Sequence, residues 1–214
     1  MTETSGRGRA ATRDGRDSRA VLLESAAAEF AKYGPRGTRI QDIVQAAGIN
    51  ERMIYHHFGS KDGLYRAVMV DQRTWLGTTW QPVLDQAAAL DDPVAGMRLA
   101  LTGFLQTLQS RPQVAALFMH EGLAGQPLAV PPGVGLPDSV RSMYERGQAA
   151  GAFPASVSFG TAYVMAVVSL VAMSVLGGQV TEFAAQLPGD AEQVIDQVLT
   201  GMTGGARRQG GPAA

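Results

Sequence analysis

The most informative segment of this 214-residue chain reads Ile54-Tyr55-His56-His57-Phe58-Gly59-Ser60-Lys61-Asp62-Gly63-Leu64. Its first residues complete a short helix, expected from Glu51 to His57, which Phe58 and Gly59 close. Ser60 is a favourable N-cap for a longer helix, expected from Lys61 to about Trp80. The segment therefore predicts two helices joined by a tight glycine turn.

Another helix is expected near the start of the chain, beginning at Asp17 or Ser18. Gly34 and Pro35 stop it, because neither residue favours continuation of a helix. Its inward face carries four residues at the three-to-four spacing of a helix: Leu22, Ala26, Phe30 and Tyr33.

A short helix is expected between Thr38 and Gly48. Thr38 and Gln41 have the spacing of a capping box, in which two side chains satisfy free backbone N–H groups at a helix start. Asn50 is a favourable cap for the helix that follows. Apolar residues on the inward faces of these helices form the expected core: Ile40, Ile43, Val44, Ala47, Ile49, Ile54, Phe58 and Leu64.

The helix that starts at Thr38 and the helix from Glu51 to His57 are joined by a tight turn at Gly48. Two short helices joined in this way form a helix-turn-helix, whose second helix enters the major groove of DNA. On that helix, Arg52 can donate to guanine, and Glu51 can accept from cytosine or complement the helix dipole. His56 shares the exposed face with Arg52, whereas His57 lies nearer the core. Lys61 starts the next helix, where its ammonium and the free N–H groups can hold one phosphate.

Residues 22–68 resemble the DNA-binding domain of the TetR/AcrR family of bacterial regulators. The matching single positions are Ala26, Phe30, Gly34, Thr38, Ile40, Ile43 and Ala46-Ala47-Gly48-Ile49. Residues 54–64 also match the family pattern of an apolar residue, Tyr, Phe, Lys, an acidic residue and Leu. The resemblance implies that the Tyr55 hydroxyl contacts a phosphate; the alternative is a core aromatic. The expected DNA-binding residues are Thr38, Asn50, Glu51, Arg52, Tyr55, His56 and Lys61.

The rest of the chain predicts only helices, over residues 93–109, 112–122, 138–150, 155–176 and 190–202. Asp92 and Pro93 suit the start of the first of these. Residues 125–137 are dense in Pro and Gly and predict a loop. The expected fold is therefore all-α, with four parts: a disordered basic arm (1–16), a helix-turn-helix domain (17–73), a larger helical domain (74–203) and a flexible tail (204–214).

Composition narrows the cellular setting. The chain has no Cys, and its polar N-terminal residues lack the apolar core of a secretory signal, so we expect a cytoplasmic protein. Residues 1–73 contain 12 Lys and Arg against 9 Asp and Glu, while residues 74–214 contain 6 against 10. The N-terminal part is therefore the part to test for DNA binding, although so small an imbalance is also typical of an ordinary soluble surface. The arginines of the arm could enter a minor groove or simply stay in solvent.

The segment from Gly147 to Thr181 contains no charged residue. It is long enough to span a bilayer, but it lacks basic and aromatic anchors, so a buried or dimerising helix is the preferred interpretation. The resemblance implies that the last two long helices pair with their copies in a homodimer. It also implies that residues from Thr74 onward bind a small-molecule effector, with two recognition helices placed on a palindromic operator.

Aromatic and Met residues are the candidates to line an effector pocket, which suggests a small, mostly apolar ligand. Ordinary core packing is the alternative for each of them. They are Trp75, Trp80, Met97, Leu101, Phe104, Phe118, Met119, Tyr144, Phe159 and Tyr163.

Signals for catalysis are weak. His120-Glu121 could supply half a metal site, but a satisfied polar pair is the simpler interpretation. No nucleophile elbow, phosphate-binding glycine loop or carboxylate pair emerges, so we expect neither an enzyme nor a cofactor. The leading hypothesis is a ligand-responsive repressor. Its rivals are an activator or ligand-independent DNA binder of the same fold, a small-molecule-binding module without DNA affinity, and a membrane-associated protein.

Overall fold

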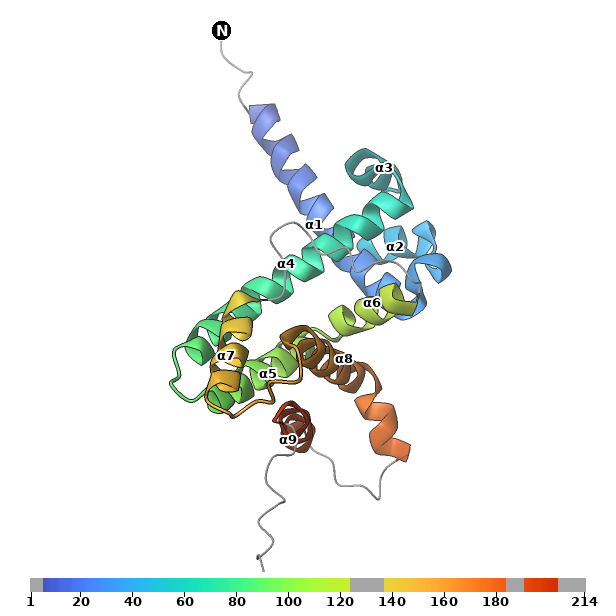
Figure 1. Cartoon of the computed structure of the whole chain (residues 1–214). Helices are drawn as coiled ribbons and strands as arrows, with labels where there is room; N and C mark the ends of the chain where they lie inside the picture. Colours follow the sequence, from blue (N-terminus) through green and yellow to red (C-terminus); the bar gives the residue numbers. More distant parts are fainter. Residues whose placement is uncertain (1–5, 124–136, 184–190, 204–214) are drawn as a thin grey trace, which may run out of the picture. The chain divides into compact units, whose positions relative to one another are not determined.

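The computed structural model describes residues 6–123, 137–183 and 191–203. These ranges are helical and contain no strand, which confirms the all-α prediction (Figure 1). The expected tail at 204–214 and residues 125–136 of the expected loop lie outside them. The helices are α1 (Gly6–Gly37), α2 (Ile40–Ala47), α3 (Arg52–Phe58), α4 (Lys61–Ala88), α5 (Pro93–Ser110), α6 (Pro112–Leu123), α7 (Asp138–Ala149), α8 (Phe159–Phe183) and α9 (Ala191–Met202).

The chain divides into two compact units. Unit 1 consists of Met1–Trp75 and Ala116–Pro127, and unit 2 of Leu76–Ala115 and Leu128–Ala214. The first division falls close to the expected domain boundary after residue 73. The sequence did not indicate, however, that residues 116–127 would join the N-terminal unit. Both α4 and α6 therefore contribute residues to each unit.

Unit 1 is built around a buried apolar cluster from α1, α2, α3, the start of α4 and the end of α6. Its fully buried members include Phe30, Ile43, Ile54 and Leu64, as the spacing predicts. Leu117 of α6 completes the cluster. The prediction for Tyr33 was wrong: it is 48% exposed, with the Lys32 ammonium 4.8 Å from its ring centre.

The turn between α1 and α2 is closed by Thr38, but not as predicted. Gly34 interrupts α1 with φ 69°, a conformation that glycine adopts without strain. The buried Thr38 hydroxyl lies 2.8 Å from the Gly34 carbonyl oxygen and 3.0 Å from that of Glu29. The N-cap of α2 is Arg39, which makes no side-chain capping bond. The predicted capping box is therefore wrong, because Thr38 donates back to α1 instead.

Helix α1 begins at Gly6, well before the predicted start at residue 17 or 18. Residues 6–16 are thus helical where the sequence predicted a disordered arm, while residues 1–5 lie outside the description. Arg, the commonest residue in this stretch, is a good helix former, and the stretch extends a helix that is already nucleated by the packed residues after it, in spite of its three glycines.

Helix α4 also exceeds its prediction, continuing through Pro82 to Ala88 instead of ending near Trp80. Proline costs an interior helix about 3 kcal/mol. Trp80 and Leu84, on either side of Pro82, are buried in unit 2, and burial of a large apolar side chain contributes about 2 kcal/mol. Packing on both sides of Pro82 thus offsets its cost.

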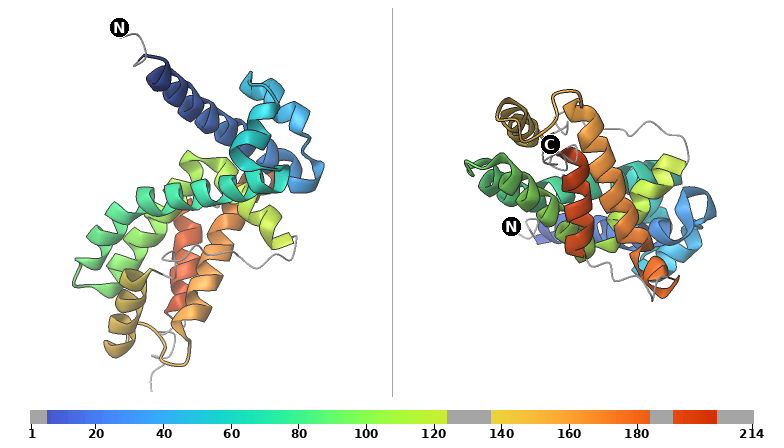
Figure 2. Two further views of the ribbon diagram at one scale, coloured as in Figure 1. Left: turned by 90° about the horizontal axis from the view of Figure 1, so that it is seen from above. Right: turned by 60° about the horizontal axis from the view of Figure 1, so that its bottom comes forward.

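Unit 2 packs α5 against α7, α8 and α9. Asp92 caps α5, its Oδ1 accepting from the Val94 N–H at 2.8 Å, with Pro93 in the first turn as predicted. Helices α8 and α9 lie side by side (Figure 2). Helix α8 starts at Phe159, later than the predicted residue 155, because the Ser158 hydroxyl accepts from the Thr161 N–H at 3.2 Å and marks the helix start.

Candidate functional site

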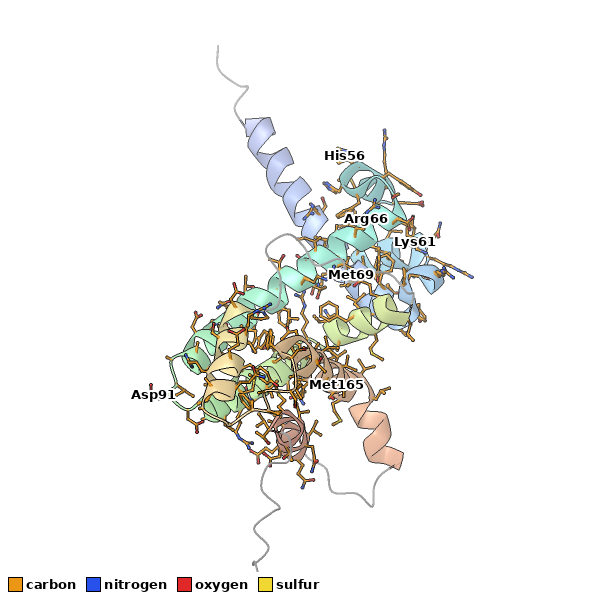
Figure 3. All side chains as sticks on the ribbon, in the orientation of Figure 1. His56, Lys61, Arg66, Met69, Asp91 and Met165 are labelled. Atoms are coloured by element: carbon orange, nitrogen blue, oxygen red, sulfur yellow. The ribbon has the colours of Figure 1, made fainter. Side chains whose placement is uncertain are left out.

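Helix α3 has one buried side and one exposed side. Ile54 is fully buried, and Phe58 packs against the same core. Arg52, Tyr55 and His56 are exposed, with Tyr55 at 50%. Figure 3 marks His56 on this helix and Lys61 at the start of α4. The apolar residues therefore fix the helix in unit 1 while its polar residues face solvent.

The first turn of α3 is organised by its own side chains. Asn50 Oδ1 accepts from the Arg52 N–H at 2.9 Å, so Asn50 does satisfy a free N–H at the start of α3, although the N-cap position itself is occupied by Glu51. The Tyr55 hydroxyl donates to Glu51 Oε1 at 3.3 Å. The exposed Tyr55 ring contradicts the alternative of a core aromatic. One polar surface at the start of α3 is thus formed by Asn50, Glu51, Arg52 and Tyr55. A DNA-reading helix contacts base edges through its N-terminal residues.

The two histidines of α3 differ in exposure, as predicted. His56 is exposed, whereas His57 is half-buried, and its Nε2 lies 3.3 Å from the Ser18 hydroxyl of α1. Burial lowers the pKa of His57, and the charges of His56 and Arg19 lower it further. His57 therefore links α3 to α1, and its lowered pKa favours the neutral imidazole.

Lys61 begins α4, as expected, beside the positive-φ turn at Gly59. The Ser60 hydroxyl accepts from the Gly63 N–H at 3.0 Å, which confirms its capping role. Thr38, in contrast, is only 1% exposed and turned toward α1. Six of the seven expected DNA-binding residues therefore remain accessible, and Thr38 offers no side-chain surface to a ligand.

Arg19 is a candidate that the sequence analysis did not single out. It is exposed on α1, and its guanidinium carbon lies 5.4 Å from the centre of the Phe58 ring. Such a cation–π contact holds the charge beside α3. The only sequence signal for Arg19 was its place among the N-terminal arginines.

The end of α6 supplies buried polar contacts to unit 1. Glu121 forms a buried ion pair with Arg73 of α4. Burial raises the pKa of Glu121, and Arg73 opposes that shift. His120 Nε2 lies 3.1 Å from the Ala31 carbonyl oxygen. His120 and Glu121 thus have separate protein partners, as the polar-pair interpretation expected. Among the described residues, no group of three or more acidic or His side chains is placed to hold a metal.

Unit 2 encloses a small cavity of about 10 Å³ between α4, α5, α7, α8 and α9. It brings together six of the predicted pocket residues: Trp80, Met97, Leu101, Phe104, Phe159 and Tyr163. The sequence analysis did not name its smaller lining residues: Ala100, Val140, Ala166, Val167 and Met202. Burial raises the pKa of Tyr163 to about 12, so its phenol stays neutral.

The other predicted pocket residues lie elsewhere. Tyr144 is fully buried and stacks on Phe153, with ring centres 4.9 Å apart. Trp75, Phe118 and Met119 belong to unit 1, where Phe118 packs against the core. The structure therefore does not bring these four residues into the cavity lining.

A larger, open groove of about 520 Å³ lies between α8 and α9. Val164, Met165 and Val168 of α8 are exposed, Met165 at 64%; Figure 3 marks Met165 on this helix. Phe159–Leu176 is long and apolar enough to cross a membrane by length and composition, but the core helix of a soluble protein can pass the same test. Unit 2 thus exposes an apolar surface over two helices.

Comparison with known proteins matches residues 22–68 to the family of bacterial regulatory proteins named tetR. The HTH-type transcriptional repressor KstR2 of Mycolicibacterium smegmatis is 37% identical over 79 residues, 37% of this chain and 38% of that protein. The HTH-type transcriptional regulator RutR of Escherichia coli is 31% identical over 120 residues, 53% of this chain and 55% of that protein. The matched region thus spans less than two thirds of these relatives.

Solved structures resemble the whole fold. KstR2 of Mycobacterium tuberculosis, described as a ketosteroid transcriptional regulator, superposes with a TM-score of 0.59 at 23% identity, covering 87% of this chain and 93% of that one. A TetR family regulator from Marinobacter aquaeolei gives 0.61 at 17% identity, covering 89% and 96%. The family match coincides with the segment that builds the helix-turn-helix. The helix-turn-helix of this chain is therefore that of the TetR family of bacterial regulatory proteins.

Proposed function

We propose that this chain is a cytoplasmic, homodimeric transcriptional repressor. It binds a palindromic DNA operator through α3 and leaves it when a small apolar effector binds unit 2. The observation that carries the proposal is the division of α3 into a buried anchor at Ile54 and an exposed polar surface at Arg52, Tyr55 and His56. A helix with this arrangement can enter the major groove without losing its hold on the core.

The roles on DNA follow from the chemistry of the exposed groups. Asn50, Glu51 and Arg52 stand where side chains reach base edges, and Arg52 can donate two hydrogen bonds to guanine. Tyr55, His56 and Lys61 hold phosphates, which positions the helix without reading sequence. DNA choice therefore depends mainly on the first turn of α3.

Dimerisation is proposed through α8 and α9. Met165 lines the groove between these helices, and Val164 and Val168 of α8 are also exposed apolar residues. Contiguous apolar surface of this kind marks interaction sites in soluble proteins. A second copy packed there would form a four-helix bundle, and its two-fold axis would set two copies of α3 about 34 Å apart, one helical turn of DNA.

Effector binding is proposed at the cavity of unit 2. Trp80, Met97 and Phe104 belong to a lining without a charged residue, which favours an uncharged apolar ligand. At about 10 Å³ the cavity has room for about one water molecule, so a ligand must bind an opened form of unit 2. A ligand with that preference shifts the population away from the closed form.

The test is a mobility-shift titration with the DNA flanking the gene of this protein, at low salt, with and without candidate effectors. A discrete complex that an effector dissolves is the expected result. No complex at low salt, where phosphate contacts are strongest, would overturn the DNA-binding proposal. A complex that persists with every effector, while reporter transcription rises when the protein is present, would favour the activator.

A further inference from the structure

Arg141 of α7 lies against the lining of the unit 2 cavity. Its guanidinium carbon is 5.3 Å from the centre of the Phe159 ring, which is within the range of a cation–π contact. Phe159 lines the cavity, and so does Val140, the residue before Arg141. A positive charge thus lies one aromatic ring away from a cavity whose own lining is uncharged.

The charge of Arg141 is accessible to a ligand. Arg141 is exposed. In the part of the chain that the structure describes, no carboxylate lies within ion-pair distance of its guanidinium. This holds even for Asp138 and Glu145, which are three and four residues away on the same helix. The Phe159 ring is therefore the partner that the structure shows for this guanidinium.

Two other arginines of unit 2 have partners of a different kind. Arg98 of α5 forms an ion pair with Asp196 of α9. Arg146, also on α7, donates to the carbonyl oxygen of Leu90 at 3.2 Å. Arg141 differs from both because its contact is an aromatic ring of the cavity lining, which leaves its N–H donors for a ligand.

A carboxylate can replace the Phe159 ring as the partner of Arg141. A guanidinium forms two parallel, charge-assisted hydrogen bonds with a carboxylate, and these are stronger than an exposed cation–π contact. Phe159 is also the first residue of α8, and helix ends open at a lower free energy than helix interiors. The closed cavity of about 10 Å³ has to open for any ligand. Movement of this ring would supply room and connect the cavity with Arg141.

We infer that the effector is an amphipathic carboxylate, with its apolar body in the cavity and its carboxylate on Arg141. The inference rests on the proposed function, which places the effector in this cavity. The uncharged lining then selects only the body of the ligand, because Arg141 lies outside the lining. The ion pair with Arg141 determines which end of the ligand points into unit 2.

The experiment compares two carboxylates of different shape, octanoate and naphthylacetate, with the matched neutral alcohols octanol and naphthylethanol. Isothermal titration calorimetry measures binding to the full-length protein. At least one carboxylate should bind the wild-type protein about tenfold more tightly than its alcohol, or better. Arg141→Gln should remove this preference without changing the affinity for the alcohols. Arg141→Lys keeps the charge but not the two parallel donors, so it should keep part of the preference.

The matched control is Arg98→Gln, which removes the same charge from an exposed position of unit 2 and should keep the wild-type preference. Circular dichroism checks that each variant folds. An equal loss in Arg98→Gln would show a general charge effect and overturn the inference. So would an Arg141→Gln protein that keeps the preference, or a wild-type protein that binds neither carboxylate.

Anisotropy titrations of the operator complex with the same four compounds separate the inference from the proposed function. Release by the carboxylates, lost in Arg141→Gln, is the expected result. If the alcohols release the wild-type protein as well as the carboxylates do, the inference fails alone. If the wild-type protein binds no DNA at low salt, the proposed function fails, whatever calorimetry shows for the carboxylates.

Discussion

The hydroxyl of Tyr55 lies 3.3 Å from Oε1 of Glu51, one turn earlier on α3. This hydrogen bond holds a half-exposed phenol at the protein surface and gives it an acceptor that a DNA phosphate must replace. It also places a carboxylate beside the proposed phosphate contact. The same pair therefore combines a group that holds the backbone with a group that can read a base.

Replacing Tyr55 with Phe should weaken binding to all DNA sequences alike. The variant keeps the ring but removes the donor, at a cost of about 1.5 kcal/mol, roughly tenfold in affinity. Anisotropy titrations with the operator and with random DNA measure both effects. Tyr33→Phe is the control, because Tyr33 is similarly exposed but lies on α1. A loss confined to the operator would show that Tyr55 reads a base instead.

Arg52→Ala should change which DNA is preferred. A bidentate contact to guanine contributes about 1–3 kcal/mol of discrimination, so operator affinity should fall about tenfold or more. Competition against operators with single base changes should show the preference lost at one position in each half-site. If all positions weaken equally, Arg52 contacts the backbone.

Contacts between sequence neighbours were the most predictable part of this structure. The hydrogen bonds that Asn50, Ser60 and Asp92 accept at helix starts each join groups two or three residues apart, so residue type and spacing identify them. Thr38 had equally good spacing but donates to the carbonyl of Glu29, nine residues away, because the chain reverses at Gly34. The spacing of residues in the sequence does not predict how the chain turns at Gly34, and so it could not predict the hydrogen bond from Thr38 to Glu29.

Contacts across long separations were not predictable. Arg73 and Glu121 are 48 residues apart, and no local pattern pairs them. The same limit applies to the cavity, where large residues such as Trp80 stand out in the sequence but Ala100 and Val140 do not. Which apolar residue faces a cavity depends on how helices pack, whereas periodicity shows only which residues turn inward.

The Arg73–Glu121 pair gives a prediction on stability. Glu121→Leu leaves a buried guanidinium without its partner and should lower the free energy of unfolding by about 3–5 kcal/mol. R73M/E121L, which removes both charges, should cost much less. Urea denaturation followed by circular dichroism measures both. Arg98→Gln breaks the exposed Arg98–Asp196 pair and should cost under about 1 kcal/mol. A double variant as unstable as the single one would mean that the pair itself stabilises unit 1.

His57 predicts how stability depends on pH. Its pKa is lowered below the ordinary 6.5 by burial, His56 and Arg19, so the folded protein binds this proton more weakly than the unfolded chain. The shifted pKa of His57 therefore contributes to the free energy of unfolding in full above about pH 6.5, the pKa of an unfolded His. This contribution is lost as the pH falls through the lower pKa of the folded state. Urea denaturation at pH 8 and about pH 5 should therefore show a smaller acid-induced loss in His57→Gln than in wild type. Equal losses would mean that the His57 pKa is the same in both states.

The exposed apolar face of α8 supports the last prediction. Met165 and Val168 are 64% and 60% exposed and lie three residues apart, on one side of the helix. Met165→Glu would bring two like charges, one from each copy, into the proposed apolar contact, at a cost of several kcal/mol. The dimer dissociation constant should rise at least about a hundredfold, as measured by analytical ultracentrifugation. Gln106→Glu adds the same charge at an exposed position of α5 and should leave the dimer intact. Operator affinity should fall with dimerisation in Met165→Glu, because a monomer binds only one half-site. A Met165→Glu protein that stays dimeric would place the contact between copies on another surface.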